Sequence, residues 1–545
     1  MTKNLSLILI ALLCSLQTHS SAYRQFRRNI SPDGKANILV CLPESGKATG
    51  RAVVICPGGG YEWLAMENEG TNWIPFFTER GIACMILTYR MPHGDLSIPV
   101  GDAGKAVSMV RDSAAVWGIN PYDVGIMGSS AGGHLASTLA THAPLRSRPD
   151  FQILFYPVIS MDADRTHAGS VTNFLGEKRH DRRYVEMYSN ELQVRRNATP
   201  PALILLSTDD TLVPPVTNGV AYYSALRDAG IPAAMYAYAE GEHGFGSQTS
   251  FIYHEQLLQD IASWLDNLKT PRRDAVRVAC IGTGITAGQG LDMSGTYGYT
   301  ARLKRILGDG YNVRNFGAAG STMLSEGDRA YINEPEWSEV MDFRPDIVVM
   351  ELGTNDSKPA NRGRIAALET DLRRMTASLK ALDTKPEICL ALPMKAWDNS
   401  EGISDSVITE TIIPLMRRVA KKDGLRVTDL HSRQTAYAGR RNTPRQERRG
   451  GDGRHRCGRD KEDERGRKGT VSPTVRARLT GRGKTPALRK RLSGVAEEAF
   501  PACGRASLRL RKRLFRKPEK ALWEVRKGSS ASQESLYHKT ITIIP

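Results

Sequence analysis

The amino-acid sequence predicts an α/β protein with two domains of alternating strands and helices. A chain of 545 residues is long enough for two or three domains, each with its own core. Short apolar runs rich in Val, Ile and Leu alternate with helical stretches up to residue 268, and a second alternation begins at residue 276. Runs of this kind are typical of strands buried on both faces of a mostly parallel sheet.

The N-terminus has the features of a secretory signal peptide over residues 1–22. Lys3 precedes an apolar run over residues 5–16, and small residues follow up to Ala22. This run is too short to serve as a permanent membrane anchor. We therefore expect cleavage after Ala22, export to the periplasm or the medium, and no membrane association of the mature chain.

The first domain is expected over residues 23–268. Its strands are predicted from six apolar runs, at residues 52–56, 82–89, 123–127, 151–159, 202–206 and 233–238. The clearest helix should begin with Asp102 as its N-cap and end at Gly118. The long polar segment 160–199 is expected to cap the site and shape the substrate pocket.

Residues 124–134 (VGIMGSSAGGH) carry the pattern Gly-x-Ser-x-Gly where a strand gives way to a helix. Gly128 and Gly132 flank Ser130 at the required spacing, whereas Ser129 has no such partners. A turn of this type holds the serine hydroxyl above the sheet, next to a helix start. Ser130 is therefore the candidate nucleophile, although the same five-residue pattern also occurs in ordinary Gly-rich loops.

A serine hydroxyl becomes nucleophilic when an imidazole takes its proton and a carboxylate orients that imidazole. Two loops that follow expected strands supply Asp210 and His243, in the chain order serine, aspartate, histidine. Asp210 is preferred to the adjacent Asp209 because it begins the segment Asp-x-x-Val-Pro. His134 is the competing histidine, and it is expected to point along the helix that follows the serine.

Residues 56–61 (CPGGGY) follow the first expected strand and predict an oxyanion hole. Its donors would be the backbone N–H groups of Gly59 and Gly60, together with that of Ala131 after the nucleophile. The alternative is an ordinary tight turn. Acyl transfer by a serine, a histidine, an aspartate and backbone N–H groups implies no metal and no organic cofactor.

Together these motifs resemble the acetylxylan-esterase-like group of α/β-hydrolases, over residues 40–268. The matching segments are CPGGGY, GSSAGGHLAS, DxxVP and EHGFG, with Pro57 where related lipases have His. The resemblance implies hydrolysis of small acyl esters on a sugar chain, so that, with the predicted export, we expect a secreted esterase that removes acyl groups, chiefly acetyl groups, from plant polysaccharide such as xylan. The residues themselves predict only serine-type acyl transfer, so a serine peptidase of the same fold is the alternative. Residues 23–51 leave little room for the large N-terminal domain that such peptidases carry.

After a linker over residues 269–275, a second domain is expected over residues 276–432. Residues 315–320 (NFGAAG) and 353–356 (GTND) each follow an apolar run, and further strands are expected at 346–352, 387–392 and 426–430. These segments resemble the SGNH, or GDSL-like, hydrolases, which have a three-layer α/β/α fold. The resemblance implies that Gly320 and Asn355 contribute to an oxyanion hole.

The serine position of that family is occupied by Gly284, in the segment IGTGIT. Glycine has no group with which to attack, so the second domain should lack covalent chemistry. A dinucleotide-binding loop at Gly282-x-Gly284 is disfavoured because no ribose-binding acid is found. We expect a scaffold or a carbohydrate-contacting module instead.

The family's closing Asp-x-x-His pair has its spacing at Asp452 and His455. Residues 433–470, however, contain no Val, Ile, Leu, Met, Phe or Trp and cannot supply a closing amphipathic helix. The segment 433–545 is either a disordered basic interaction arm or the product of a shifted reading frame. On the second hypothesis, a chain ending at Leu268 should keep full esterase activity.

The charge and the cysteines limit the function further. Residues 433–545 hold 31 Lys and Arg against 11 Asp and Glu, a net of +20, so the rest of the chain carries −3 of the total +17. Because residues 1–432 are slightly acidic and are expected to be exported, nucleic-acid binding by this part of the chain is disfavoured.

The cysteines predict no disulfide framework. Small buried side chains are expected at Cys56, Cys84, Cys280 and Cys389, because all four lie in apolar runs.

Overall fold

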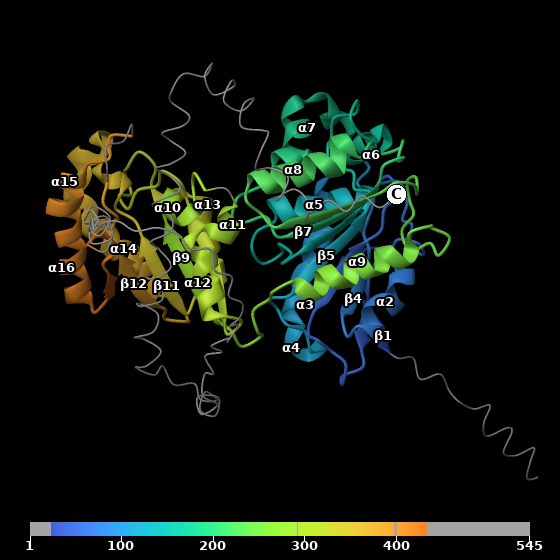
Figure 1. Cartoon of the computed structure of the whole chain (residues 1–545), viewed down its shortest axis with the longest axis horizontal. Helices are drawn as coiled ribbons and strands as arrows, with labels where there is room; N and C mark the ends of the chain where they lie inside the picture. Colours follow the sequence, from blue (N-terminus) through green and yellow to red (C-terminus); the bar gives the residue numbers. More distant parts are fainter. Residues whose placement is uncertain (1–22, 292, 397–400, 433–545) are drawn as a thin grey trace, which may run out of the picture.

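A computed structural model describes residues 23–291, 293–396 and 401–432 (Figure 1). Two β-sheets lie side by side, each with helices on both faces. The α/β fold class predicted from the sequence is therefore confirmed. The predicted signal peptide and the basic segment 433–545 lie outside the described residues.

The first sheet has eight strands in the order β1-β2-β4-β3-β5-β6-β7-β8. β1 and β2 pair antiparallel, and β2 is also antiparallel to β4. The six strands β3 to β8 are parallel to one another. The strands are β1 Tyr23–Asn29, β2 Asn37–Pro43, β3 Ala52–Cys56, β4 Ala83–Thr88, β5 Val124–Ser129, β6 Gln152–Phe155, β7 Ala202–Ser207 and β8 Ala233–Tyr238.

The six apolar runs correspond to β3 through β8, but the two antiparallel strands were not predicted. β1 lies at the sheet edge, and its sequence YRQFRRN leaves most side chains exposed, so it carries no apolar run. The run at 151–159 forms a shorter strand than predicted, because the backbone turns at Tyr156 with a φ of 32°. The side chains of Val158 and Ile159 are nevertheless buried.

Helices cover both faces of this sheet: α2 Ile74–Glu79, α3 Ser97–Asp112, α4 Ala114–Trp117, α5 Ala131–His142, α6 Ala168–Leu175, α7 Arg182–Tyr188, α8 Ala221–Asp228 and α9 His254–Asn267. The prediction that Asp102 caps a helix is wrong, because it lies inside α3. Its carboxylate is fully buried and binds Arg90 at 2.7 Å. Gly118 does end the helical stretch, in the left-handed conformation, but the predicted single helix is interrupted at Ser113, so that Gly118 caps the short α4 and not α3.

Alternation along the strands places two separate cores on the two faces of the first sheet. In β3, Val54 packs with α3 and α5, whereas Val53 and Ile55 pack with α2 and α9. The five cysteines of the described residues are buried and free, as expected for small core side chains. No helix in the described ranges is long and apolar enough to span a membrane.

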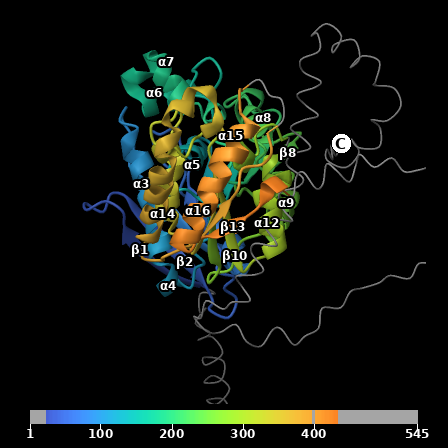
Figure 2. The same cartoon turned by 90° about the vertical axis from the view of Figure 1, so that its left-hand side faces the viewer.

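The second sheet has five parallel strands in the order β10-β9-β11-β12-β13. Its strands are β9 Val276–Gly282, β10 Tyr311–Gly317, β11 Ile347–Glu351, β12 Glu387–Ala391 and β13 Arg426–Thr428. Its helices are α10 Gly284–Ala287, α11 Ser294–Tyr297, α12 Tyr299–Leu307, α13 Pro335–Phe343, α14 Leu368–Lys380, α15 Asp405–Val407 and α16 Ile413–Asp423. Figure 2 views this domain from its outer side, where α14 and α16 pack together.

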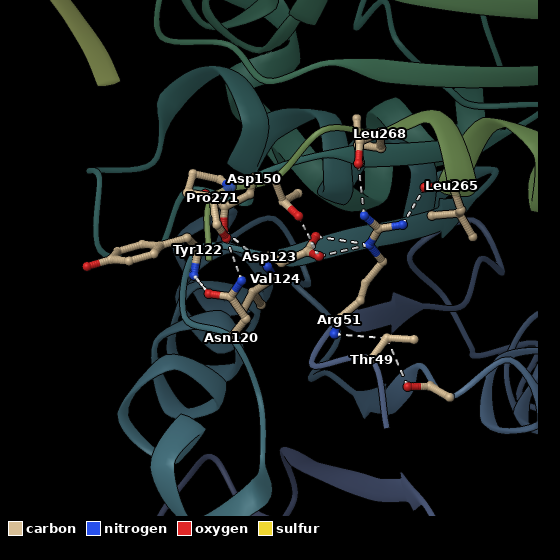
Figure 3. A network of polar contacts seen from close by, with 12 residues as sticks. Thr49, Arg51, Asn120, Tyr122, Asp123, Val124, Asp150, Leu265, Leu268 and Pro271 are labelled. Atoms are coloured by element: carbon tan, nitrogen blue, oxygen red, sulfur yellow. Dashed lines mark hydrogen bonds and ion pairs between the residues drawn. The ribbon is translucent and has the colours of Figure 1, made fainter. Parts of the chain in front are cut away.

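The chain between the two sheets is held against the first domain by polar contacts (Figure 3). Arg51 forms an ion pair with Asp123 at 3.0 Å and also donates to the carbonyls of Leu265 and Leu268, at the end of α9. Asn120 donates to the carbonyl of Pro271 at 2.7 Å. The segment that leaves α9 therefore follows the first domain closely before β9 begins.

Buried charges connect the two domains. Arg148, with 3% of its side chain exposed, pairs with Glu339 of α13 at 2.5 Å. Asp150 pairs with Arg111 of its own domain and with Arg314 of β10, each at 2.8 Å. Burial alone would raise the pKa of Asp150, but the two guanidinium groups outweigh this effect and lower it. The domains are therefore joined by ion pairs whose carboxylates, Glu339 and Asp150, are largely buried.

Candidate active site

Ser130 occupies the tight turn between β5 and α5. Its backbone has φ 52° and ψ −121°, a conformation that L-residues adopt rarely and that tightly packed surroundings must hold in place. A Cβ at Gly128 would lie 2.1 Å from the carbonyl oxygen of Gly132, and one at Gly132 would lie 2.0 Å from that of Cys56. The two glycines of the motif are therefore required for the close approach of strand and helix.

The structure brings Ser130, His243 and Asp210 together. Ser130 Oγ lies 2.8 Å from His243 Nε2, and His243 Nδ1 lies 2.7 Å from Asp210 Oδ2. Because the carboxylate can only accept, the proton of the neutral imidazole resides on Nδ1, and Nε2 is left to accept from the serine hydroxyl. The side chain of Asp210 is 1% exposed and is held by the backbone N–H groups of Leu212 and Val213.

The two competing residues have other partners. The Asp209 carboxylate accepts from the backbone N–H groups of Gly241 and Glu242 and so shapes the loop that carries His243. His134 is fully buried: its ring contacts Tyr61 Oη at 2.8 Å and the carbonyl oxygen of Tyr188 at 2.9 Å. Burial lowers the pKa of His134 to about 4. His134 is thus a neutral core side chain that links the Gly-rich loop to α7.

The predicted oxyanion-hole segments meet beside Ser130. Gly59 and Gly60 have φ values of 123° and 66°, and a Cβ at the preceding Gly58 would lie 2.9 Å from Ser130 Cβ. Ala131 is the first residue of α5, where backbone N–H groups have no partner within the helix. The Gly-rich loop that follows β3 and the start of α5 that follows β5 therefore lie next to each other at Ser130.

Glu69 is a buried carboxylate of the site that was not identified from the sequence. It accepts from the Gly58 N–H at 2.7 Å and from Tyr156 Oη at 2.8 Å, and the Tyr156 ring lies 4.7 Å from that of His243. Burial raises the pKa of Glu69, against the opposing effect of these two hydrogen bonds. Glu62 and Glu67 lie in the same loop, so the sequence held no signal for which carboxylate turns inward.

A cavity of about 640 Å³ opens above the serine. Most of its lining comes from the loop that follows the Gly-rich segment, and the remainder from the nucleophile, the histidine loop and the segment 160–199. The lining residues are Gly59, Gly60, Glu62, Trp63, Leu64, Ala65, Met66, Glu67, Asn68, Glu69, Ser130, His167, Leu212, His243 and Gly244. His167 brings the predicted capping segment to the pocket, and Asn173 of α6 donates to the Gly60 carbonyl at 2.9 Å.

In the second domain, the three loops that carry the predicted site positions follow the neighbouring strands β10, β9 and β11. Gly282 pairs in register with both Gly317 and Glu351, so the loops carrying Gly284, Gly320 and Asn355 leave the same edge of the sheet. The side chain of Asn355 donates to the Ser321 carbonyl at 2.9 Å, next to Gly320. The predicted pair Asp452 and His455 lies outside the described residues.

A buried carboxyl group lies below the turn at Gly284. Glu351 accepts from the hydroxyl groups of Thr283 and Thr286 at 3.0 and 3.2 Å, and it is fully buried. Burial raises the pKa of Glu351 to about 7, although the hydrogen bonds from the threonines lower it. The Thr283 hydroxyl is thus directed at an internal carboxyl group, and Gly284 presents no side chain.

Residues 54–247 match the model of the alpha/beta hydrolase fold family, and residues 280–455 match that of the GDSL-like lipase/acylhydrolase family. A search of solved structures finds an acetyl ester-xyloside bifunctional hydrolase from Caldicellulosiruptor lactoaceticus, with 27% identity and a TM-score of 0.42. This likeness covers 46% of the present chain and 98% of that one.

Two curated relatives are similar to the chain over different lengths. An endo-1,4-beta-xylanase B of Butyrivibrio fibrisolvens is 34% identical over 35% of this chain and 32% of its own. An acetylxylan esterase of Xylanibacter ruminicola is 47% identical over 439 residues, which cover 77% of this chain and 91% of the relative. The chain therefore belongs to the family of that acetylxylan esterase and is a carboxylic ester hydrolase, with an alpha/beta hydrolase domain followed by a GDSL-like domain.

Proposed function

We propose that this protein is an exported serine esterase that removes acetyl groups from xylan or its oligosaccharides, with one catalytic triad. The observation that carries the proposal is the chain of hydrogen bonds from Asp210 through His243 to Ser130, at the floor of an open cavity. The similarity to an acetylxylan esterase over nine-tenths of that relative supports the substrate class.

In the first half of the reaction, Ser130 Oγ attacks the acyl carbonyl carbon and its proton passes to His243 Nε2. Asp210 keeps the imidazole in the required tautomer and stabilises the imidazolium that forms. The negative charge on the carbonyl oxygen is stabilised by the backbone N–H groups of Gly59, Gly60 and Ala131. When the tetrahedral intermediate collapses, the sugar oxygen takes the proton from His243 and leaves.

In the second half, water replaces the sugar oxygen. His243 takes a proton from this water as it attacks the acyl group on Ser130, and the same oxyanion donors stabilise the second tetrahedral intermediate. Collapse returns the proton to Ser130 Oγ and releases the carboxylic acid, which is acetic acid for an acetyl ester. Every protein group in the cycle is a side chain or a backbone amide of the first domain.

The substrate class is tested by comparing two kinds of leaving group. Acetate release from acetylated xylan and from an aryl acetate should be fast, whereas amine release from aminoacyl anilides should remain near background. A peptidase of the same fold would give the opposite pattern. Amidase activity without esterase activity would overturn the proposal.

Export is part of the same proposal and rests on Lys3, the apolar run at 5–16 and Ala22. Cleavage after Ala22 would leave β1 whole, since this strand covers Tyr23–Asn29. The mature protein should be found in the periplasm or the medium with Tyr23 as its first residue, which N-terminal sequencing detects. A cytoplasmic protein that retains residues 1–22 would contradict export.

A further inference from the structure

Trp63 is an exposed aromatic side chain at the rim of the cavity that also contains Ser130. It is 60% exposed, whereas Trp73 in the same domain is 1% exposed. Tryptophan is highly buried on average and is enriched where proteins contact partners, so an exposed indole at a cavity is available to contact a ligand. Neither the triad nor the oxyanion hole uses this ring, so its place in the site requires another explanation.

The position of Trp63 is fixed by the Gly-rich loop. Its backbone N–H donates to the Gly59 carbonyl at 3.2 Å, and a Cβ on Gly59 would lie 3.2 Å from Cδ2 of the indole. The ring therefore lies against one of the two residues assigned to the oxyanion hole. Because tryptophan has only two side-chain torsions, its flat apolar surface loses little conformational entropy when a ligand binds to it.

A second ring lies beside the next residue of the same loop. A Cβ on Gly60 would be 3.5 Å from Cε1 of His167, the N-cap of α6. His167 Nδ1 accepts from the backbone N–H of Ser170 at 3.3 Å, so the ring proton is on Nε2. Burial, and then the proximity of His243, lower the pKa of His167, which keeps this imidazole neutral at neutral pH.

The cavity is also larger than an acyl group requires. A volume of about 640 Å³ lies in the range that holds a whole drug-sized ligand, whereas an acetyl group has only three non-hydrogen atoms. Glu62 and Glu67 in the lining disfavour an anionic ligand. The remaining space therefore suits a neutral ring with apolar and hydrogen-bonding parts.

We propose that Trp63 is the stacking platform for a pyranose ring of the acylated polysaccharide, and that His167 Nε2–H donates to a hydroxyl group of that sugar. This inference rests on the proposed function and names how its substrate is held. A pyranose ring presents C–H groups on its faces and hydroxyl groups at its edge. These match a rigid indole face and a neutral N–H donor.

The experiment compares two acetyl esters by the same readout, acetate release. One is an acetylated xylo-oligosaccharide, and the other is ethyl acetate, which has no ring. In Trp63→Ala, the ratio of kcat/KM for the sugar ester to that for ethyl acetate should fall about tenfold, mainly through KM. Trp63→Phe should recover much of the ratio, and His167→Ala should lower it as well.

Ile252→Ala is the matched control, because Ile252 is an exposed apolar residue, 72% exposed, that does not line the cavity. This variant should keep the wild-type ratio. An unchanged ratio in both Trp63→Ala and Trp63→Phe would overturn the platform while leaving the proposed function intact. If the wild-type protein hydrolyses ethyl acetate but not the sugar ester, the proposed substrate class fails first.

Discussion

The turn after β5 and the turn after β9 each follow a strand that pairs in parallel with both of its neighbours, yet only the first carries a serine at the position expected for a nucleophile. Ser130 follows β5 in a strained backbone conformation, and its hydroxyl group is hydrogen-bonded to His243 Nε2. Gly284 follows β9 after Thr283, whose hydroxyl group is directed at the buried Glu351. The edge of a parallel sheet gathers polar loops in both domains, but chemistry depends on which side chain stands at one position.

The largest expected effect tests this difference directly. Ser130→Ala should reduce acetate release on the order of a millionfold, as removal of the serine does in a well-studied serine protease, since the second domain has no hydroxyl group at Gly284. Gly284→Ser in the Ser130→Ala background is compared with it, because a Cβ there would meet the Gln289 side chain, whose flexible Oε1 lies 2.5 Å away. Activity that appears only in this double variant would show that the second site had lost little beyond its nucleophile. Substantial activity in Ser130→Ala alone would refute the single-triad proposal.

The domain interface gives the next largest effect. Arg148→Ala leaves the half-buried Glu339 with Arg195 as its remaining partner, and we expect a loss of about 3–5 kcal/mol in the free energy of unfolding. Arg146→Ala is the control, because the Arg146 and Asp112 side chains are 69% and 57% exposed, and it should cost at most about 1 kcal/mol. Chemical denaturation measures both, and equal small effects would contradict a structural role for the interface.

The same interface changes the expectation for a chain that ends at Leu268. Such a chain would leave Arg148 and Asp150 without their partners on α13 and β10 and would expose Leu145, which packs in the core of the second domain. We therefore expect the shortened chain to lose stability, although its triad is complete. Esterase activity and an unfolding midpoint equal to those of the full chain would show that the domains are independent.

Glu351 should make the stability of the second domain dependent on pH. Its pKa rises from 4.5 to about 7 on folding, so the unfolded state releases this proton more readily than the folded state. The stabilisation is fully present below pH 4.5 and is lost as the pH rises to about 7, a change of up to about 3 kcal/mol. Glu351→Gln should flatten the unfolding free energy across this window, and an unchanged slope would contradict the assignment.

Glu69 gives the smallest of these effects, and it acts on the first domain. Glu69→Leu has a similar size but no oxygen to accept from Gly58 N–H or from Tyr156 Oη. We expect kcat to fall about 10–100-fold with little change in KM, because the oxyanion loop loses its anchor. Glu79→Leu, an exposed substitution on α2, is the control, and a loss confined to KM would argue against positioning.

Several predictions from the sequence depended on local patterns, and these agree with the structure. The alternation of apolar runs predicted β3 through β8, and the spacing of glycines around Ser130 predicted the tight turn. The order of Ser130, Asp210 and His243 predicted three side chains that the structure brings within hydrogen-bonding distance. Fold class and family membership followed from the same motifs, because each motif consists of a few neighbouring residues that can be recognised in the sequence.

What the sequence alone determined is therefore the parallel strands β3 to β8, the tight turn at Ser130 and the glycine at position 284. Tertiary structure alone decided which carboxylate enters the site, since Glu69 is held inward by Tyr156, which is 87 residues away in the chain, as well as by the nearby Gly58. It also decided that Asp102 is buried beside Arg90 instead of capping a helix. The physical reason is that burial and pairing of charges depend on which segments meet in space, whereas a turn or an apolar strand is specified by adjacent residues.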